Sequence, residues 1–255
     1  MNSSLSLGRF SVRLFVLGLF LSLALVGCKK KAHKHKGHKH VHAKKGHKHT
    51  GPGKNHKNPE YKHDTMRHSF DDVKLFVKIF DNPKRKLWQK PALVTKSMDL
   101  KPGMSAADIG AGTGYFLPYL RASVGDKGKV WGLDVSKPMV KHMAKRIKKA
   151  GWKNVTAKHV KYADPLLGAK SVDRVLIVNT WHHVKNRVAY AKKLKAALKA
   201  GGAVFVVDFK KSSKKGPMKK HKLKPEQIVD EFKKAGMKAT ILKVDLPDQY
   251  IVKGS

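Results

Sequence analysis

The chain has 255 residues, a length that accommodates one domain of moderate size together with additional segments. Hydrophobic residues make up 41% of it, enough to bury a core, and the formal net charge of +39 predicts a surface that attracts polyanions such as nucleic acid or anionic lipid. Because 48 of the 56 basic residues are lysine, this charge favours general solvation or surface adsorption over specific nucleic-acid recognition. The single cysteine, Cys28, excludes a disulfide framework, a cysteine-based zinc site and a thiol nucleophile within the domain.

The first 28 residues have the pattern of an export signal. Arg9 and Arg13 lie in a stretch without acidic residues, and an apolar run over residues 14–27 follows that is too short for a comfortable membrane span. The run ends in LVGC, which resembles the lipobox of bacterial lipoproteins, in which the cysteine, here Cys28, is lipidated. The resemblance implies a membrane-anchored lipoprotein of the bacterial cell envelope, on the periplasmic side, with the outer membrane as one destination. If the signal is not used, the protein stays in the cytoplasm.

Residues 29–58 form a low-complexity segment with eight His and eleven Lys. The segment has too few apolar residues to bury a core, so we predict a disordered linker. Closely spaced histidines could bind Zn, Cu or Ni, namely His33, His35, His38, His40 and His42. The interleaved lysines oppose cation binding, which favours a solvated polycationic spacer that contacts an anionic membrane surface.

The predicted domain runs from residue 59 to residue 255 and opens with a helical cap over about residues 59–100. Ser69 to Asp72 has the form of a capping box with Ser69 as the N-cap, and apolar residues then recur at helical spacing up to Phe80. Further on, segments alternate. Strands are predicted at 105–109, 129–135, 155–160, 172–179, 203–208, 238–244 and 249–252. Helices are predicted up to Trp88, at 91–98, after Gly114, and at 136–150, 187–199 and 225–235. This alternation predicts an α/β fold with helices on both faces of a largely parallel sheet and an antiparallel pair at the end.

A glycine-rich loop follows the first predicted strand. Asp108 precedes Gly110, Gly112 and Gly114, and Asp134 ends the second strand, where a carboxylate suits ribose hydroxyls. These features alone allow a dinucleotide or an S-adenosylmethionine site. The spacing is G-x-G-x-G, whereas a dinucleotide fingerprint is G-x-G-x-x-G, and a carboxylate would repel pyrophosphate but attract the ammonium group of a methionine moiety.

Four motifs, ADIGAGTGYF, GLDVS, VDRVLIVNTWHHV and LKAGGAVFVVDF, resemble in this order the class I S-adenosylmethionine-dependent methyltransferases from about Leu100 to the C-terminus. The resemblance implies a Rossmann-like fold with a mostly parallel seven-stranded sheet and an antiparallel final strand. It also implies S-adenosylmethionine as the cofactor, bound by Asp108, Gly110, Ala111, Gly112, Gly114, Asp134, Val135, Asp164 and Asn179. In this scheme Asp108 orients the amino-acid part, Asp134 holds the ribose, Leu133 and Val135 flank the adenine, and Asn179 lies beside the sulfonium. Asp164 would meet the adenine amine, although an Asp-Pro turn is the alternative interpretation.

The candidate catalytic residues are His182, His183 and Asp208, because either histidine follows the fourth strand and could act as a base at neutral pH. A packing role for the histidine pair is the competing interpretation. Tyr61, His63 and His68 could cover the site as a lid. We expect methyl transfer to a small-molecule acceptor. The alternatives are a membrane-anchored, non-catalytic binding protein on the same fold and a nucleic-acid methyltransferase that uses the basic surface. An exported domain would lie away from the cytosol, where S-adenosylmethionine is made.

Overall fold

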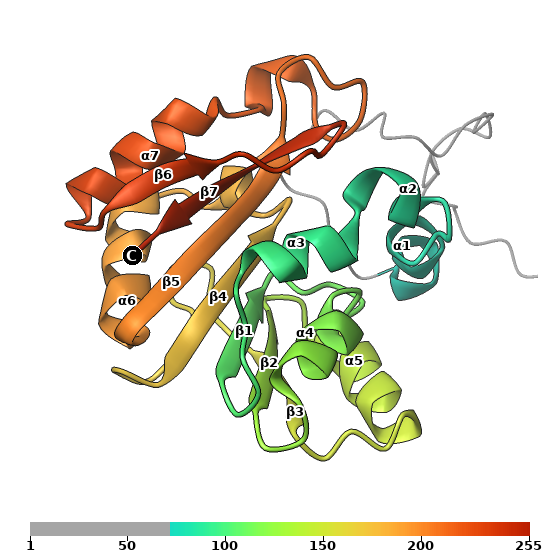
Figure 1. Cartoon of the computed structure of the whole chain (residues 1–255). Coiled ribbons are helices and arrows are strands. Elements are labelled where there is room, and N and C mark those ends of the chain that lie inside the picture. Colours follow the sequence, from blue (N-terminus) through green and yellow to red (C-terminus); the bar gives the residue numbers. More distant parts are fainter. Residues whose placement is uncertain (1–71) are drawn as a thin grey trace, which may run out of the picture. The chain divides into compact units, whose positions relative to one another are not determined.

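A computed structural model describes residues 72–255 (Figure 1). The predicted signal and Cys28, the candidate metal ligands from His33 to His42, the lid residues and Ser69 lie outside the described residues. The described helices are α1 (Val73–Phe80), α2 (Arg85–Gln89), α3 (Pro91–Ser97), α4 (Leu117–Val124), α5 (Lys137–Lys149), α6 (Arg187–Ala197) and α7 (Pro225–Lys234), with 3-10 turns η1 (Trp181–His183) and η2 (Lys219–His221). The strands are β1 (Ser105–Ile109), β2 (Lys129–Asp134), β3 (Val155–His159), β4 (Val172–Val178), β5 (Leu198–Phe209), β6 (Ala239–Leu242) and β7 (Gln249–Gly254).

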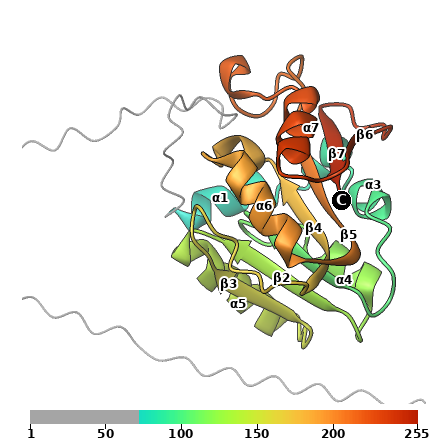
Figure 2. The ribbon, with the colours of Figure 1, turned by 90° about the vertical axis from the view of Figure 1, so that its left-hand side faces the viewer.

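The strands form one seven-stranded sheet in the order β3-β2-β1-β4-β5-β7-β6. Strands β1 to β5 pair in parallel, and β7 runs antiparallel to both of its neighbours, β5 and β6. This confirms the predicted Rossmann-like α/β fold. Helices α3, α4 and α5 cover one face of the sheet and α6 and α7 the other (Figures 1 and 2).

The central strands are buried on both faces, which explains their continuous apolar sequence. Neighbouring residues alternate between the two cores: Ala106 packs with the core under α3–α5, and Ala107 packs with the core under α6 and α7. The same alternation along β5 sends Phe205 to the first core and Val206 to the second. The sheet is therefore the rigid middle layer that fixes where the polar residues at its edge lie.

Two local predictions differ from the structure. The N-cap of α1 is Asp72, whose side chain accepts a hydrogen bond from Leu75 N at 3.0 Å, and helix α1 starts only at Val73, so a capping box led by Ser69 is wrong. The predicted helix over 187–199 ends at Ala197, because β5 begins at Leu198, which pairs with Val172. The register between β4 and β5 then shifts before Ala203, so the Gly201-Gly202 pair that looked like a helix stop lies within an irregular strand.

Candidate functional site

The glycine loop joins β1 to α4 at the carboxyl ends of the parallel strands. Sheets of this kind bind ligands at that end. Gly110 has a φ of +70°, and a Cβ there would lie 2.3 Å from Thr180 Oγ1, so no larger residue fits without displacing the chain after β4. Gly112 has a φ of +56°, and its N–H donates to Asp134 Oδ2 at 2.8 Å. The loop is thus held against both neighbouring strand ends.

Asp108 lies beneath this loop and is 2% exposed. Within residues 72–255, no donor forms a hydrogen bond with its carboxylate. Burial raises the pKa of Asp108 to about 7, and the Asp134 charge adds to this effect while the Arg85 guanidinium opposes it. A buried carboxylate without a donor is costly, and a cationic ligand group would relieve that cost.

Asp134 ends β2 and is also buried, which raises its pKa. Its Oδ1 accepts from Ser136 N and its Oδ2 from Gly112 N, both at 2.8 Å, and these backbone bonds act against the effect of burial. Each carboxylate oxygen has more than one lone pair, so the side chain could also accept ligand hydroxyl groups. The predicted pair Asp108 and Asp134 therefore does meet at one place, around the glycine loop.

The other predicted cofactor residues differ in where their side chains lie. Ala111 and Val135 lie at the loop and just after β2, whereas the side chain of Leu133 is fully buried in the core under α6 and α7. Asp164 lies in a turn where Oδ1 accepts from Leu166 N at 2.9 Å and Oδ2 pairs with Lys193 Nζ at 2.8 Å. Both oxygens of the Asp164 carboxylate thus already bond to groups of the protein, on Leu166 and Lys193.

Asn179, directly after β4, has a φ of +55° and takes part in a buried chain of amides. Gln249 at the start of β7 donates from Nε2 to Asn179 Oδ1, and Gln89 at the end of α2 donates from Nε2 to Gln249 Oε1. Both glutamines are fully buried. Nothing in the sequence singles out Gln89 or Gln249 as site residues. Their only sequence signals are a glutamine before Pro91 and another at a strand start, and neither signal is specific.

His182 and Asp208 form a buried pair. Nδ1 of His182 lies 2.9 Å from Oδ2 and 3.0 Å from Oδ1 of Asp208, and their side chains are 3% and 1% exposed. The turn that carries His182 is fixed by Trp181, whose Nε1 donates to Glu231 in α7 at 2.8 Å. The ring of His183 lies 4.2 Å from that of His182, so the three predicted catalytic residues are brought together.

Helix α1 packs over the glycine loop. The ring of Phe80 lies where a Cβ on Gly112 would be 3.3 Å from it. Asp81, directly after α1, accepts a hydrogen bond from Thr113 Oγ1 at 2.8 Å and pairs with Arg146 of α5 at 3.3 Å. The described part of the predicted cap therefore covers the loop that the sequence singled out.

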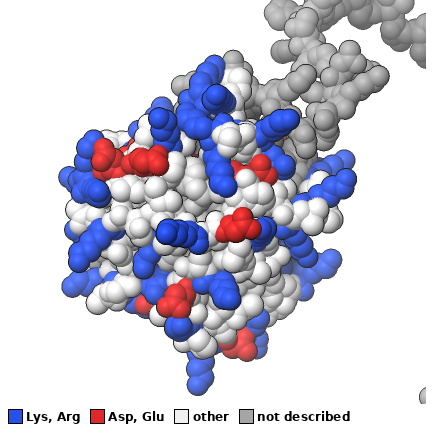
Figure 3. Space-filling model, turned by 45° about the horizontal axis from the view of Figure 1, so that its top comes forward, with Lys and Arg blue, Asp and Glu red and all other residues white. Residues whose placement is uncertain are grey.

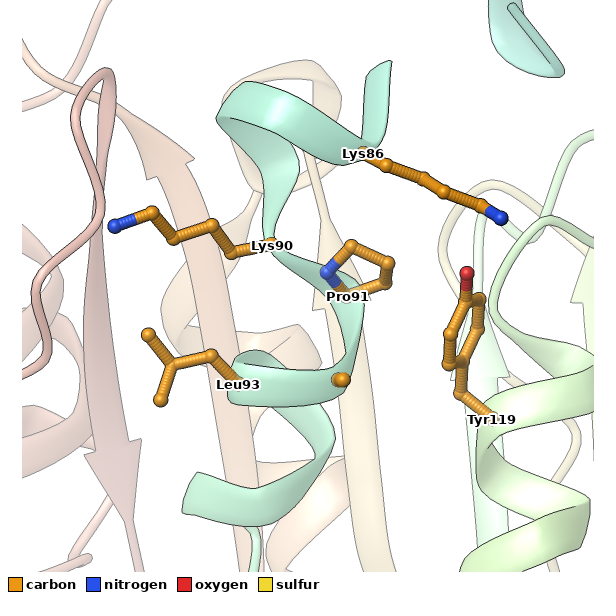
Figure 4. A pocket seen from close by; sticks show the side chains of 6 residues that line it. Lys86, Lys90, Pro91, Leu93 and Tyr119 are labelled. Atoms are coloured by element: carbon orange, nitrogen blue, oxygen red, sulfur yellow. The ribbon is translucent and has the colours of Figure 1, made fainter. Parts of the chain in front are cut away.

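A separate hollow of about 350 Å³ lies between the α2–α3 connection and α4 (Figure 4). In the close-up view, Lys86 extends toward Tyr119, with Pro91 between Lys86 and Leu93. None of the predicted cofactor or catalytic residues lines this hollow. Within residues 72–255 there is also no group of three or more metal-ligating side chains.

Lysine and arginine side chains are spread over the face shown in Figure 3, with acidic side chains between them. Several surface lysines pair with acids, for example Lys90 with Asp245 at 3.0 Å. This distribution does not single out one continuous basic groove on that face. Among the described residues, no helix is both long and apolar enough to cross a membrane.

Comparison with known proteins agrees with the geometry. A family model described as a methyltransferase domain matches residues 106–202, which include the glycine loop, Asp134 and Asn179. Residues 106–202 thus resemble a methyltransferase domain. A structure described as a SAM dependent methyltransferase from Aquifex aeolicus is 27% identical, with a TM-score of 0.67, and the match covers 74% of this chain and 98% of that one. These matches support S-adenosylmethionine as the cofactor of this domain.

More distant comparisons agree in fold. The demethylmenaquinone methyltransferase of Bacillus mycoides (strain KBAB4) is 26% identical over 149 residues, which are 58% of this chain and 62% of that protein. The chain thus spans less than two thirds of the length of this relative. A methyltransferase in complex with the Haloferax volcanii activator Trm112 is 16% identical, with a TM-score of 0.59 over 74% of this chain and 97% of that one, and shares the fold.

The residues at the carboxyl ends of the strands fit S-adenosylmethionine. The orphaned Asp108 carboxylate suits an ammonium group, the Asp134 carboxylate suits ribose hydroxyls, and the glycine loop has a backbone that a ligand can approach closely. The His182–Asp208 pair lies at the carboxyl ends of β4 and β5, on the same edge. The arrangement can therefore hold a zwitterionic nucleoside ligand beside a candidate base.

Proposed function

We propose that the chain is an S-adenosylmethionine-dependent methyltransferase that acts on a small-molecule acceptor. The observation that carries this proposal is the buried Asp108 carboxylate beneath the glycine loop, which accepts no hydrogen bond within residues 72–255 and lies at the same end of the sheet as the His182–Asp208 pair. When bound, S-adenosylmethionine supplies an electrophilic methyl group on a sulfonium. The residues of the chain bind, orient and accept a proton.

Asp108 and Asp134 supply the binding contacts. Asp108 takes the ammonium group of the ligand, because a charge-assisted bond there stabilises the ionised carboxylate, which burial disfavours. Asp134 takes the ribose hydroxyls, since backbone N–H groups already orient both of its oxygens. Fixing both ends of a ligand aligns the reacting groups, which lowers the barrier to an in-line displacement.

His182 is the proposed base. If Nδ1–H donates to Asp208, Nε2 carries the lone pair and can accept the proton that an acceptor O–H, N–H or C–H loses. Asp208 then acts as the positioning residue that fixes the tautomer and the plane of the ring. His183 lies close enough to serve as a second candidate base.

One comparison bears on the acceptor class. The Bacillus mycoides relative is named for demethylmenaquinone, which makes demethylmenaquinone the first acceptor to test.

The two alternative functions make different demands on the site. A non-catalytic binding protein has no need of a buried histidine bonded to a carboxylate, so the His182–Asp208 pair favours an enzyme. A nucleic-acid methyltransferase needs a basic groove, and the face in Figure 3 has acidic side chains between the basic ones.

We also propose that a lipid on Cys28 anchors the protein to the cell envelope and that the basic linker contacts the anionic membrane surface. The sequence pattern alone supports this, because both segments lie outside the described residues. A labelled fatty acid should be incorporated by the full chain and not by Cys28→Ala. Equal labelling of both would overturn the proposal.

Calorimetric titration of the full chain with S-adenosylmethionine tests the proposed function. We expect saturable binding. Asp134→Asn should weaken it by at least about 10-fold, because the ribose hydroxyls of the ligand lose the carboxylate that accepts their hydrogen bonds. Asp126→Asn is the matched control, since Asp126 is a highly exposed acid outside the site. Absence of binding by the folded wild-type chain would overturn the proposal. Binding should be followed by mass spectrometry of the methylated acceptor.

A further inference from the structure

The segment FDNPKRKLWQKP places one arginine of α2 against the glycine-loop side of the domain. Arg85 Nη1 donates to Phe80 O at 2.8 Å, and its Nε and Nη2 contact Gln89 Oε1 at 3.3 and 3.2 Å. The centre of its guanidinium group lies 4.0 Å from the centroid of the Tyr115 ring. Tyr115 directly follows Gly114, so the guanidinium group is stacked on the residue that ends the glycine loop.

Buried amides hold this arginine in place. Gln89 uses Nε2 for Gln249, so its Oε1 is directed at Arg85, and Gln249 in turn uses Nε2 for Asn179. We call Gln89, Gln249 and Asn179 the amide relay. Burying two glutamines is costly unless their polar atoms are bonded, and the relay bonds them in a single direction. It therefore fixes the guanidinium group relative to the ends of β4 and β7.

Arg85 also acts on Asp108. Its positive charge lowers the pKa of Asp108 against the larger effect of burial, which means that the two charges sense each other. In the described part of the chain no hydrogen bond joins them. A fixed guanidinium group and a buried carboxyl group thus border the same glycine loop.

We propose that Arg85 binds the carboxylate of the amino-acid end of the cofactor while Asp108 binds its ammonium group, and that the amide relay positions Arg85 for this contact. A zwitterionic amino-acid group carries both charges on one carbon, and a guanidinium fork matches a carboxylate in two parallel hydrogen bonds. This inference rests on the proposed function, because it concerns the same cofactor site. It gives the arginine in the α2 segment a role in reading the ligand.

The competing interpretation is structural. Arg85 could serve only to tie α1 to α2 through its bond to Phe80 O. In that case its loss would loosen the cap and weaken every ligand of the site alike. Ligands that differ only in the carboxylate separate the two interpretations.

The experiment is calorimetry of the full chain with three ligands: S-adenosylmethionine, its decarboxylated analogue and 5′-methylthioadenosine, which lacks the whole amino-acid end. We expect Arg85→Gln to weaken S-adenosylmethionine about 10- to 100-fold, the range for a charge-assisted bond, and the other two ligands by less than about 2-fold. Arg85→Lys keeps the charge without the fork and should give an intermediate loss. Lys84→Gln is the matched control, because it removes an exposed positive charge next to Arg85 and should change no affinity.

Gln89→Met tests the relay. It keeps the size of the side chain and removes its amide, so S-adenosylmethionine should bind about 3- to 10-fold more weakly, as for the loss of one positioning contact, with 5′-methylthioadenosine unchanged. In an Arg85→Gln background the same change should have no further effect on S-adenosylmethionine.

The outcomes separate the two proposals. If the wild-type chain binds S-adenosylmethionine but Arg85→Gln weakens all three ligands equally, or none, the role of Arg85 is overturned and the proposed function stands. If the folded wild-type chain binds none of the three ligands, both proposals are overturned. Affinity for 5′-methylthioadenosine also reports whether each variant retains its folded site.

Discussion

Nδ1 of His182 lies 2.9 Å from Oδ2 of Asp208, and both side chains are almost completely buried at the end of the fourth and fifth strands. A histidine held in this way has one nitrogen committed to the carboxylate and the other available for proton transfer. Loss of this pair should therefore lower the rate of methyl transfer more than it weakens ligand binding.

His182→Gln should lower the rate of methyl transfer about 10²- to 10⁴-fold, the usual contribution of a general base, while the affinity for S-adenosylmethionine changes little. Asp208→Asn should lower the rate about 10- to 100-fold, because the ring loses its fixed orientation. Lys185→Gln, at an exposed position just beyond the turn, is the control. Single-turnover rates check the prediction, and unchanged rates in His182→Gln would assign the pair to packing.

The stability of the folded chain should depend on Asp108. Its pKa is raised to about 7 by burial, against about 3.9 in an unfolded chain. Between about pH 4 and pH 7 the folded state binds more protons than the unfolded state, so the contribution of the neutral carboxyl is complete below that window and is lost as the pH rises through 7. Asp108→Asn should therefore be more stable than the wild-type chain at pH 8, by on the order of 2–4 kcal/mol, and similar to it near pH 4.

Urea unfolding at the two pH values measures this difference. The stability difference between Asp126→Asn and the wild-type chain should be the same at both pH values, since Asp126 is exposed. A wild-type chain whose stability does not fall relative to Asp108→Asn as the pH rises would contradict the assigned pKa.

Cofactor affinity should have its own pH dependence. The ammonium group of the ligand needs the ionised Asp108 carboxylate, so affinity for S-adenosylmethionine should rise by up to about 10-fold per pH unit below 7 and level off above it. Asp108→Asn should bind weakly at every pH. Titrations at pH 6 and pH 8 distinguish this from a flat profile, which would place the ammonium group elsewhere.

Gly110→Ala tests the close approach of the chain after β4. A Cβ would lie 2.3 Å from Thr180 Oγ1 at a backbone φ of +70°, so both strain and a clash should destabilise the fold by more than about 2 kcal/mol and weaken cofactor binding. Gly201→Ala is the matched control, because its φ is +71° and a Cβ there would meet nothing within 4 Å. The control should cost about 1 kcal/mol and leave binding unchanged. Chemical unfolding and calorimetry of both variants check this.

Asp81→Ala removes the contacts that join α1 to the glycine loop and to α5. Both the Thr113 hydroxyl and the Arg146 guanidinium lose a partner, so we expect a loss of about 1–2 kcal/mol in stability. Hydrogen exchange should speed up in α1 more than in the sheet. The change of Asp126 to Asn breaks a highly exposed pair and should cost less than about 1 kcal/mol. Unaltered exchange in α1 would show that packing alone, through residues such as Phe80, holds the helix.

Much of the fold could be predicted from the sequence because its signals are local. The apolar run over β4 and the glycine loop after Asp108 each specify one kind of structure. The start of β5 at Leu198 could not be predicted, because helical residues continue up to Lys199 and only pairing with Val172 makes the backbone extended there. The N-cap of α1 at Asp72 could not be predicted either, because Ser69, three positions earlier, is an equally good capping residue.

The candidate site was predictable only in part for the same reason. Asp108 and Asp134 belong to motifs that a reader of the sequence can recognise, whereas Gln89 and Gln249 have a role only because residues 160 positions apart meet at one edge. Arg85 lies within the predicted helical cap, yet nothing in the sequence shows that its guanidinium group stacks on Tyr115. Contacts between distant segments have no local signature.

The bond between Gln89 and Gln249 also has a consequence for how the protein is made. Gln249 lies in β7, the last of the described strands along the chain, while Arg85 precedes the whole sheet. The arginine cannot be fixed by the relay until β7 has been synthesised and has inserted between its two neighbours. A nascent chain on the ribosome, or a chain truncated before β7, would thus keep its glycine loop and both aspartates and still lack the fully ordered ligand site.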